Sequence, residues 1–292
     1  MPTLLVLMMS ILLTACSSAA AVKNVQNSPL PPTAMLESTA EEAICYTAEL
    51  ETWEDASFAE DGTPLVSYSY TLPTLRAARE DGTVIEHAET PAEEQALAMA
   101  AAFNDRFSTW VTAEDFEGLT QEAQADLDWR RAEQMEWTSG YVLELDCSVY
   151  QTEHLISVFG VYYSHIDGAA HPNTWMMAWN FDLEEGTFFE PQLLGEGQDL
   201  QAAVTEEIIR QAGEPAQDGT IPAEAYWEDY REIAANWSTA AVSFDQEGMV
   251  VTFSPYELAA YALGPQTFRF SYRWMEPHLS SHAREILELE SP

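Results

Sequence analysis

The chain has 292 residues, with 49 acidic side chains against 11 Lys and Arg, for a formal net charge of −38. This imbalance excludes nucleic acid as a partner, because such binding needs basic groups that neutralise phosphates. It also opposes docking on anionic lipid heads without an anchor. It favours cationic partners through electrostatic steering, although solubility in salty or acidic surroundings explains it equally well. Since 47% of the residues are hydrophobic, a real core is available, for one large domain or two closely associated ones.

A short apolar run at the start, residues 4–13, ends in Leu13-Thr14-Ala15-Cys16, the pattern of a bacterial lipoprotein signal. The run is too short to span a bilayer, which takes about 20 residues. We therefore expect a signal peptide over 1–15, lipid on Cys16 and a flexible tether over 16–40, which place the protein on the outer face of the cell membrane. The first three residues lack the usual positive charge, and a buried N-terminal helix is the alternative.

The first half of the folded sequence predicts two strands followed by two helices. Apolar residues alternate over 44–51 and again over 66–72, where Pro73 ends the second strand, and the turn residues of 61–64 separate the two. Thr90, Pro91 and Glu93 predict a capped helix start. A second helix follows after a break near Thr112. Its apolar face and that of the first helix consist of Ala96, Ala100, Phe103, Phe107, Trp110, Phe116, Leu119, Ala123 and Leu127.

The second half carries the densest strand pattern, over 141–149, 155–163 and 175–181. Two helices are predicted next, one with Asp199 as its N-cap and one from Pro222. A hairpin over 241–253 and a last strand near 267–270 follow. Because strands and helices come in blocks, the pattern predicts an α+β fold, with a largely antiparallel sheet packed against helices in two intimately associated subdomains.

Two cysteines remain if Cys16 is lipidated. Cys45 and Cys147 form a possible disulfide in an oxidising compartment. The alternative is two unrelated thiols, with Cys147 packed in the core.

Histidines offer two weak metal hypotheses. His278 and His282 have the i, i+4 spacing of a zinc pair on one helical face, and a solvated C-terminal helix is the alternative. His165, Asp167 and His171 cluster in the long loop between the two most apolar strands. A structural His171, bonded to backbone, is the alternative there.

The segment 254–264 directly follows a strand. Ser254 as cap, Pro255 as the first helical residue and Gly264 at the end predict one helix of about two turns. Tyr256 and Tyr261 then either pack in the core or present a flat surface to a partner. The sequence holds no nucleophile elbow, phosphate loop, dinucleotide fingerprint or zinc-protease motif, so we expect no catalytic, cofactor or metal site.

The loop and this segment both resemble a known family. Residues 158–181, with Asp167-Gly168-Ala169-Ala170-His171-Pro172-Asn173, are similar to the Gly-Gly-Ala-His loop of the extracytoplasmic domain shared by the lysozyme-sensing anti-sigma factor RsiV and the peptidoglycan deacetylase PdaC. Residues 247–264, with Phe253-Ser254-Pro255-Tyr256-Glu257 and Tyr261-Ala262-Leu263-Gly264, are similar to its second signature. Residues 68–73 and the helix around Asn104 resemble the smaller domain that commonly precedes it.

The resemblance covers about residues 44–277 and implies domains at 41–137 (the smaller domain) and 138–280 (the RsiV-type domain), with a tail over 281–292. It implies an α+β extracellular module without catalytic machinery, and, in the anti-sigma factor, a receptor surface for c-type lysozyme, a basic protein. The sequence departs from the family in three ways: it lacks the sigma-binding segment with its membrane helix, it lacks the deacetylase domain, and Ala169 replaces the second glycine.

We therefore expect a lipid-anchored module that binds a cationic, lysozyme-like protein or peptidoglycan. The alternatives are a structural or assembly lipoprotein of the envelope and a peptidoglycan hydrolase or deacetylase. The expected ligand-contacting residues are Asp167, Gly168, Ala169, His171, Pro172, Asn173, Pro255, Tyr256, Glu257 and Tyr261.

Overall fold

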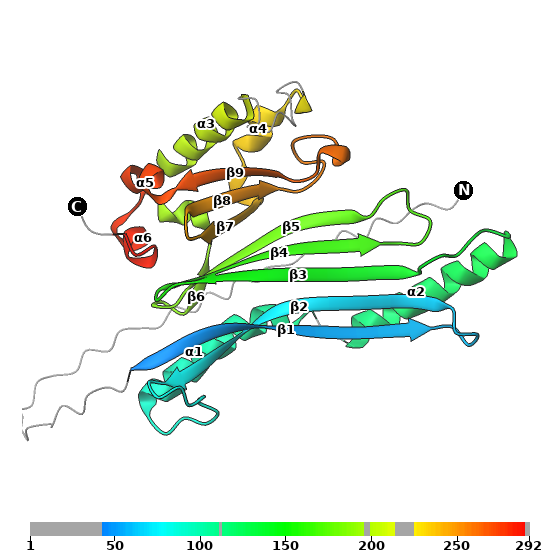
Figure 1. The fold of residues 1–292 in the computed structure, drawn as a ribbon, viewed down its shortest axis with the longest axis horizontal. Coiled ribbons are helices and arrows are strands. Elements are labelled where there is room, and N and C mark those ends of the chain that lie inside the picture. Colours follow the sequence, from blue (N-terminus) through cyan, green and yellow to red (C-terminus); the bar gives the residue numbers. More distant parts are fainter. Residues whose placement is uncertain (1–42, 111–112, 196–198, 214–224, 290–292) are drawn as a thin grey trace, which may run out of the picture. The chain divides into compact units, whose positions relative to one another are not determined.

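The computed structural model describes residues 43–110, 113–195, 199–213 and 225–289. The described residues form a six-stranded sheet, in which the strands follow one another in chain order, and a three-stranded sheet (Figure 1). All neighbouring strands are antiparallel except β2 and β3. The large sheet comprises β1 (Ile44–Phe58), β2 (Pro64–Arg79), β3 (Tyr141–Gln151), β4 (Leu155–His165), β5 (Asn173–Asp182) and β6 (Thr187–Phe189). The small sheet comprises β7 (Ala241–Asp245), β8 (Gly248–Phe253) and β9 (Gln266–Ser271).

Six α-helices and four 3₁₀ helices connect or cover these strands within the described residues. They are α1 (Pro91–Ser108), α2 (Ala113–Ala132), η1 (Pro191–Leu194), α3 (Asp199–Gly213), α4 (Tyr230–Ala234), η3 (Trp237–Thr239), η4 (Tyr261–Leu263), α5 (Tyr272–Met275), η5 (Glu276–His278) and α6 (Ser281–Ile286). The α+β class, the antiparallel-rich sheet and the second, smaller subdomain are confirmed. β2 and β3 come from either side of the expected domain boundary at 137/138 and pair in parallel, so both segments contribute to one sheet.

One face of the large sheet packs against α1 and α2, which lie behind it in Figure 1. The predicted start of α1 is confirmed: the Thr90 hydroxyl accepts from the Glu93 N–H, and the Glu93 carboxylate accepts from the Thr90 N–H. Phe103 and Phe107 of this helix are buried among aromatic rings of the sheet. The rings Phe103–Phe181 and Phe107–Trp179 meet edge to face, the geometry that aromatic pairs prefer.

The second strand does not end at Pro73 but runs on to Arg79. Beyond Thr71 β2 pairs with β1 alone, because its pairing with β3 covers only Val66–Thr71. On the free side the Asn104 side chain takes the place of a strand: its Oδ1 accepts from the Leu75 N–H at 2.7 Å, and its Nδ2 donates to the Leu75 carbonyl at 3.0 Å. A proline is tolerated in such an edge because it interrupts no second ladder of hydrogen bonds.

The small sheet has its own core. Residues that alternate along its strands, among them Phe244 and Val251, face the predicted apolar side of α3, where Leu200, Val204 and Ile208 are buried. α3 and the hairpin are thus confirmed. The predicted helix from Pro222 is reduced to the single turn of α4 and the 3₁₀ helix η3, with Trp237 buried; Pro222 and the break near Thr112 lie outside the described residues.

β7 packs against the other face of the large sheet through polar contacts. The Asn180 amide on β5 donates to the Val242 carbonyl at 2.8 Å and accepts from the Ser157 hydroxyl at 2.8 Å. The Ser157 hydroxyl in turn accepts from the Phe244 N–H at 2.8 Å. All four groups belong to buried residues, so their hydrogen bonds to one another fix how the small sheet meets the large one.

The Cys45–Cys147 disulfide is not formed, since both thiols are free, Cys45 exposed and Cys147 buried. Cys45 lies opposite Ala78 of β2, whereas Cys147 follows Asp146, which lies opposite Thr71. The two cysteines are therefore offset by several residues along the sheet and too far apart to bridge. Cys16, the signal peptide over 1–15 and the tether over 16–40 lie outside the described residues. Among those that are described, no helix combines the length and apolarity that crossing a membrane requires.

Candidate functional site

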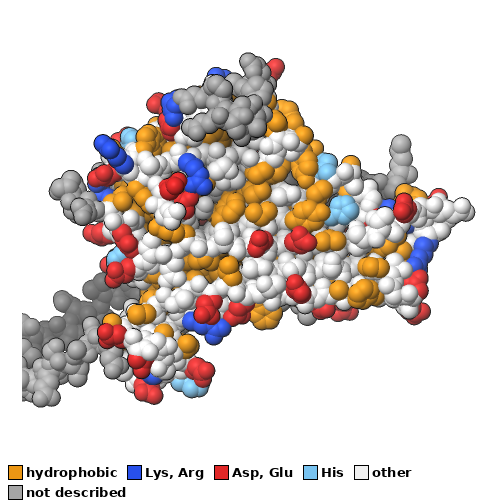
Figure 2. All heavy atoms as spheres, viewed as in Figure 1, with side chains coloured by type: hydrophobic (Ala, Val, Ile, Leu, Met, Phe, Trp, Pro, Cys, Tyr) orange, Lys and Arg blue, Asp and Glu red, His pale blue; other side chains and the backbone are white. Residues whose placement is uncertain are grey.

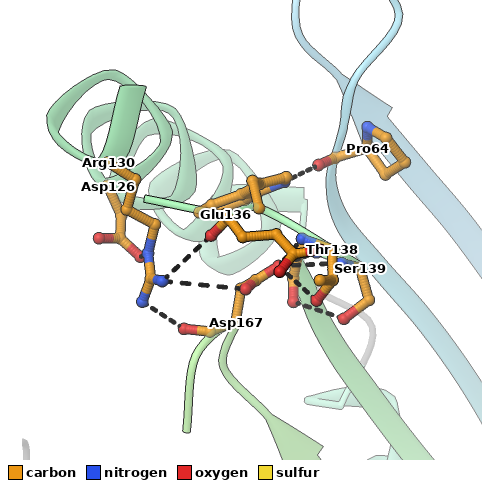
Figure 3. Close-up of polar contacts among 9 residues, drawn as sticks. Pro64, Asp126, Arg130, Glu136, Thr138, Ser139 and Asp167 are labelled. Carbon is orange, nitrogen blue, oxygen red and sulfur yellow. Dashed lines mark hydrogen bonds and ion pairs between the residues drawn. The ribbon is translucent and has the colours of Figure 1, made fainter. Parts of the chain in front are cut away.

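The loop between β4 and β5 is held from inside by Asp167, whose side chain is 2% exposed. One carboxylate oxygen accepts from the backbone N–H groups of Thr138 at 2.6 Å, Ser139 at 2.9 Å and Gly140 at 3.2 Å, and from the Thr138 hydroxyl at 3.1 Å (Figure 3). The side chain of Asp167, predicted to contact a ligand, thus points to residues 138–140 and not to solvent. The carboxylate fixes the loop to the segment that precedes β3.

The nest of N–H groups sets the ionisation of Asp167. Burial alone would raise the pKa of this carboxyl, but the hydrogen bonds from Thr138, Ser139 and Gly140 outweigh it and hold the pKa below its ordinary value. Gly140 is needed here, because it has a φ of +72° and a Cβ would lie 2.4 Å from the Leu65 carbonyl oxygen.

Arg130 at the end of α2 holds the same loop in place. Its guanidinium donates to the Asp167 carbonyl at 2.6 Å and pairs with Asp126 at 3.2 Å (Figure 3). Gly168 has a φ of +78°, and a Cβ would lie 2.4 Å from that guanidinium. Ala169 does not adopt a positive φ, so one glycine at 168 is sufficient for this backbone and alanine is compatible with the next position.

The far end of the loop meets the 254–264 segment in a cluster of three rings, His171, Tyr256 and Tyr261, here called the aromatic cluster. His171 Nε2 lies 3.1 Å from the Tyr256 hydroxyl, and its Nδ1 lies 2.9 Å from the Pro172 carbonyl oxygen. The His171 and Tyr261 rings stack at 4.3 Å with 21° between their planes. His171 therefore contacts the backbone, as the structural alternative expected. It also links two segments that lie 85 residues apart in sequence.

The predicted helix over 254–264 is wrong. Tyr256 has a φ of +74°, which a right-handed helix does not accommodate, and the segment forms turns that end in the 3₁₀ helix η4. The Ser254 hydroxyl does not cap a helix but accepts from the Met176 N–H of β5 at 3.0 Å. Gly264, with a φ of +67°, does end η4 as predicted.

Glu257 is half-buried and bonded within its own turn, where its carboxylate accepts from the Ser254 N–H. Burial raises the pKa of this carboxyl above its ordinary value, although the hydrogen bonds to Ser254 oppose the shift. The geometry does not favour Glu257 as a direct ligand contact. Tyr256, in contrast, is 53% exposed, and Pro255 beside it is partly exposed.

The structure therefore brings most of the predicted ligand-contacting residues to one surface in different roles. Within the aromatic cluster, Tyr256 is exposed, whereas Tyr261 and His171 are half-buried. Of the two alternatives for the tyrosines, Tyr256 therefore lies at the surface and Tyr261 lies between surface and core. In the loop, Pro172 is partly exposed, and three residues are exposed: Gly168, Ala169 and Asn173.

Sequence reasoning missed Trp227, Arg130 and the Thr138-Ser139-Gly140 nest. Trp227 supports Tyr256, because its indole N–H donates to the Tyr256 carbonyl at 3.1 Å while the ring stays partly exposed. The nest had one usable signal, a glycine after two small hydroxyl residues directly before a strand. Arg130 and Trp227 had none, because their partners lie 37 and 29 residues away.

The remaining histidines do not form the proposed zinc pair. His278 lies in η5 and His282 in α6, so the two do not share a helical face. His278 packs on the Trp274 ring, and His282 Nε2 lies 3.1 Å from Asp182 Oδ2, with Glu185 nearby. Asp182, Glu185 and His282 lie close enough to share an ion. The Oδ1 of Asp182 accepts from the backbone N–H groups of Glu184 and Glu185, and its Oδ2 faces His282.

Comparison with known proteins gives a fold and a domain of unknown function. The chain matches no curated protein. A DUF3298 family member from Bacteroides fragilis has a similar structure, with a TM-score of 0.57 at 12% identity over 86% of this chain and 100% of that one. A DUF3298 family protein from Pseudomonas aeruginosa aligns with a TM-score of 0.46 at 13% identity over 82% of this chain and 96% of that one. Residues 191–273, which include Tyr256 and Tyr261, match the family model DUF3298, a protein of unknown function, so this part of the chain carries a DUF3298 domain.

Proposed function

We propose that this protein is a lipid-anchored, extracytoplasmic binding module that recognises a cationic, envelope-attacking protein such as c-type lysozyme through the aromatic cluster. The observation that carries the proposal is the contact between His171 and Tyr256, at 3.1 Å. Each residue comes from one of the two segments that resemble the RsiV and PdaC domain, and the DUF3298 match is consistent with that resemblance. Two segments with a shared resemblance thus meet at one surface.

The aromatic cluster has the properties of a binding surface. Exposed tyrosine and tryptophan rings offer a large apolar area with a polar edge, and such residues dominate the binding energy of many protein interfaces. Before binding, His171 holds the Tyr256 ring at its hydroxyl, and Trp227 holds the Tyr256 backbone at its carbonyl. A fixed ring loses little conformational entropy when a partner arrives. Its left-handed backbone is also a costly conformation, of the kind that often occurs at functional sites.

Charge supports a cationic partner. The net charge of −38 attracts a basic protein over a distance and raises its association rate. On the face drawn in Figure 2, acidic side chains are spread widely and far outnumber basic ones. The two carboxylates of the loop and the 254–264 segment, Asp167 and Glu257, are held by backbone N–H groups, which supports binding rather than catalysis as the role of this surface.

The test measures hen lysozyme binding to the purified full chain by biolayer interferometry. Tyr256→Ala and His171→Ala should each weaken binding about tenfold or more, because a central aromatic contact is lost. Trp129→Ala is the matched control, since Trp129 on α2 is also 53% exposed but lies outside the cluster, and it should bind as the parent does. Binding of parent and control should weaken as salt rises. Equal binding by all three folded variants would contradict the site.

The anchor is tested separately. Cys16→Ala should move the protein from the membrane fraction to the soluble fraction, and mass spectrometry of the parent should show a lipid-modified N-terminal cysteine. An unmodified, unprocessed N-terminus in the parent would contradict the proposed lipid anchor. It would leave the proposed binding at the aromatic cluster unaffected.

A further inference from the structure

A groove of about 460 Å³ lies where the two sheets diverge, away from the aromatic cluster. One wall is the outer face of the small sheet and the other is formed by β3 and β4 of the large sheet, as the arrangement of the sheets in Figure 1 indicates. The volume falls within the range of small-molecule sites. The lining of the groove includes several hydroxyl side chains, two apolar ones and one arginine: Ser148, Ser157, Ser243, Thr252, Thr267, Phe159, Val250 and Arg269.

Strand alternation produces a groove rich in hydroxyl groups. On β7, Val242 and Phe244 face the core of the small sheet, so Ser243 between them faces the groove. On β8 the core residues Met249 and Val251 likewise leave Val250 and Thr252 on the groove side. The residues of β4 that face α1 leave Ser157 and Phe159 on the opposite wall in the same way.

Ser243 offers this groove an unused hydroxyl. The residue is only 7% exposed, no described residue makes a hydrogen bond to its hydroxyl, and the oxygen is not among the fully buried atoms that lack a partner, so it opens onto the groove. The neighbouring hydroxyls are occupied: Ser157 bonds to Asn180 and to the Phe244 N–H, and Thr252 and Thr267 bond to each other at 3.3 Å. A hydroxyl that lines a groove and has no partner within the protein is free to bond to a ligand there in place of water.

The charges around the groove indicate a neutral ligand. Arg269 is paired with Asp245 at 2.6 Å, so its positive charge is already compensated. The net charge of −38 repels anions from the surface. Where the two sheets meet in Figure 2, the surface is mostly uncharged and partly hydrophobic. Phe159 and Val250 provide apolar area against which the C–H face of a ring can pack.

We propose that this groove binds a short, uncharged saccharide, with Ser243 as a hydrogen-bonding contact and Phe159 as the apolar wall. This site is independent of the proposed lysozyme surface and goes beyond it. The hydroxyls of a sugar satisfy Ser243, and its ring face covers Phe159. A neutral ligand avoids the electrostatic penalty that an acidic one would meet.

The experiment uses the full chain and three probes: chitotriose, cellotriose and maltotriose. Saturation-transfer NMR and calorimetry measure the binding of each probe. At least one probe should bind with a dissociation constant of roughly millimolar or tighter. Ser243→Ala should weaken that binding about three- to tenfold, because one hydrogen bond is lost, and should leave the melting temperature unchanged or raised, because no internal bond is broken. Phe159→Ala tests the apolar wall and should also weaken binding.

Tyr256→Ala is the matched control and should bind saccharide as the parent does, while Ser243→Ala should bind lysozyme as the parent does. The two proposals can therefore fail separately. Absence of binding for all three probes, or equal binding by parent and Ser243→Ala, would overturn the saccharide site. The second result would mean that water alone satisfies the hydroxyl.

Discussion

The two faces of the large sheet are covered by different kinds of contact. On the helix side, Phe103 and Phe107 of α1 pack among Trp179 and Phe181 of β5. On the side of the small sheet, Asn180, between those two β5 residues, is hydrogen-bonded to the small sheet. A single strand thus supplies apolar packing on one face and polar joints on the other. Apolar packing stabilises without directional preference, whereas buried hydrogen bonds also fix one orientation, which here leaves the groove open.

The largest expected effect tests the apolar face. Phe103→Ala removes a side chain with 0% exposure and should lower the free energy of unfolding by about 3–5 kcal/mol, because it loses apolar burial and leaves a cavity. Urea unfolding measures the change, with the exposed Trp129→Ala as a control that should stay within about 0.5 kcal/mol of the parent. A loss below about 1 kcal/mol would show that the helix face contributes less than we infer.

The next effect concerns the hydrogen bonds of Asp167 near α2. Asp167→Asn should lower the free energy of unfolding by about 1.5–3 kcal/mol at pH 7, because charge-assisted hydrogen bonds from the nest are lost. The folded pKa of Asp167 is lowered, so its stabilising contribution is full above the unfolded value near 4 and is lost as pH falls through the folded pKa. The parent and variant should therefore converge in acid. A difference in the free energy of unfolding that stays constant down to acid pH would contradict the lowered pKa of Asp167. The control is Asp128→Asn at an exposed position, which should differ little from the parent at any pH.

The polar joint between the sheets is tested by Asn180→Ala. The change leaves the buried Val242 carbonyl and the Ser157 hydroxyl without their partner and should cost about 1–3 kcal/mol. Because Asn180 and Ser157 are bonded to each other, adding Ser157→Ala should cost less than it does alone, and a double-mutant cycle measures the coupling. Strictly additive losses would mean that the two residues act separately.

The smallest expected effect separates the two carboxylates of the candidate site. Glu257→Gln keeps an acceptor for the Ser254 N–H and should change stability by no more than about 0.5 kcal/mol at neutral pH. The pKa of Glu257 is raised in the folded protein, so its protonated carboxyl stabilises the fold at pH values below the pKa of the unfolded chain. This contribution to the free energy of unfolding is lost as the pH rises through the folded pKa. Melting temperatures between pH 4 and 7 should therefore fall relative to the Gln variant as pH rises, opposite in sign to the trend at Asp167.

Most of the fold could be predicted because its signals are local. The alternation along β3 and β5, the continuous apolar run of β4, the capping box at Thr90 and the apolar face of α3 each lie within one element, and each is confirmed. The strand through Pro73 could not be predicted, because what tolerates the proline is the position of β2 beyond the end of its pairing with β3. That position is a property of the whole sheet.

The candidate site was less predictable because long-range contacts decide its roles. The resemblance placed the right two segments together, but it could not show that Asp167 points inward, since the nest comes from residues before β3. The helix expected over 254–264 has good local signals, and the left-handed Tyr256 overrides them. Its conformation is held by His171 and Trp227, neither of which is near in sequence.

β1 is a 15-residue strand at the edge of the large sheet. The Gln151 side chain bonds to the Tyr46 carbonyl and the Ala48 N–H of this strand, and farther along it three large apolar side chains are exposed: Leu50, Trp53 and Phe58. Such an edge invites a strand of another molecule to add to the sheet and begin aggregation. Two acids on the same strand, Glu54 and Asp55, oppose this, because a second copy would bring like charges face to face. Glu49 and Glu51 are already paired with Arg76 of β2. We expect the acidic side chains of β1 to keep neighbouring copies from joining into a shared sheet, which matters most where many copies are crowded together.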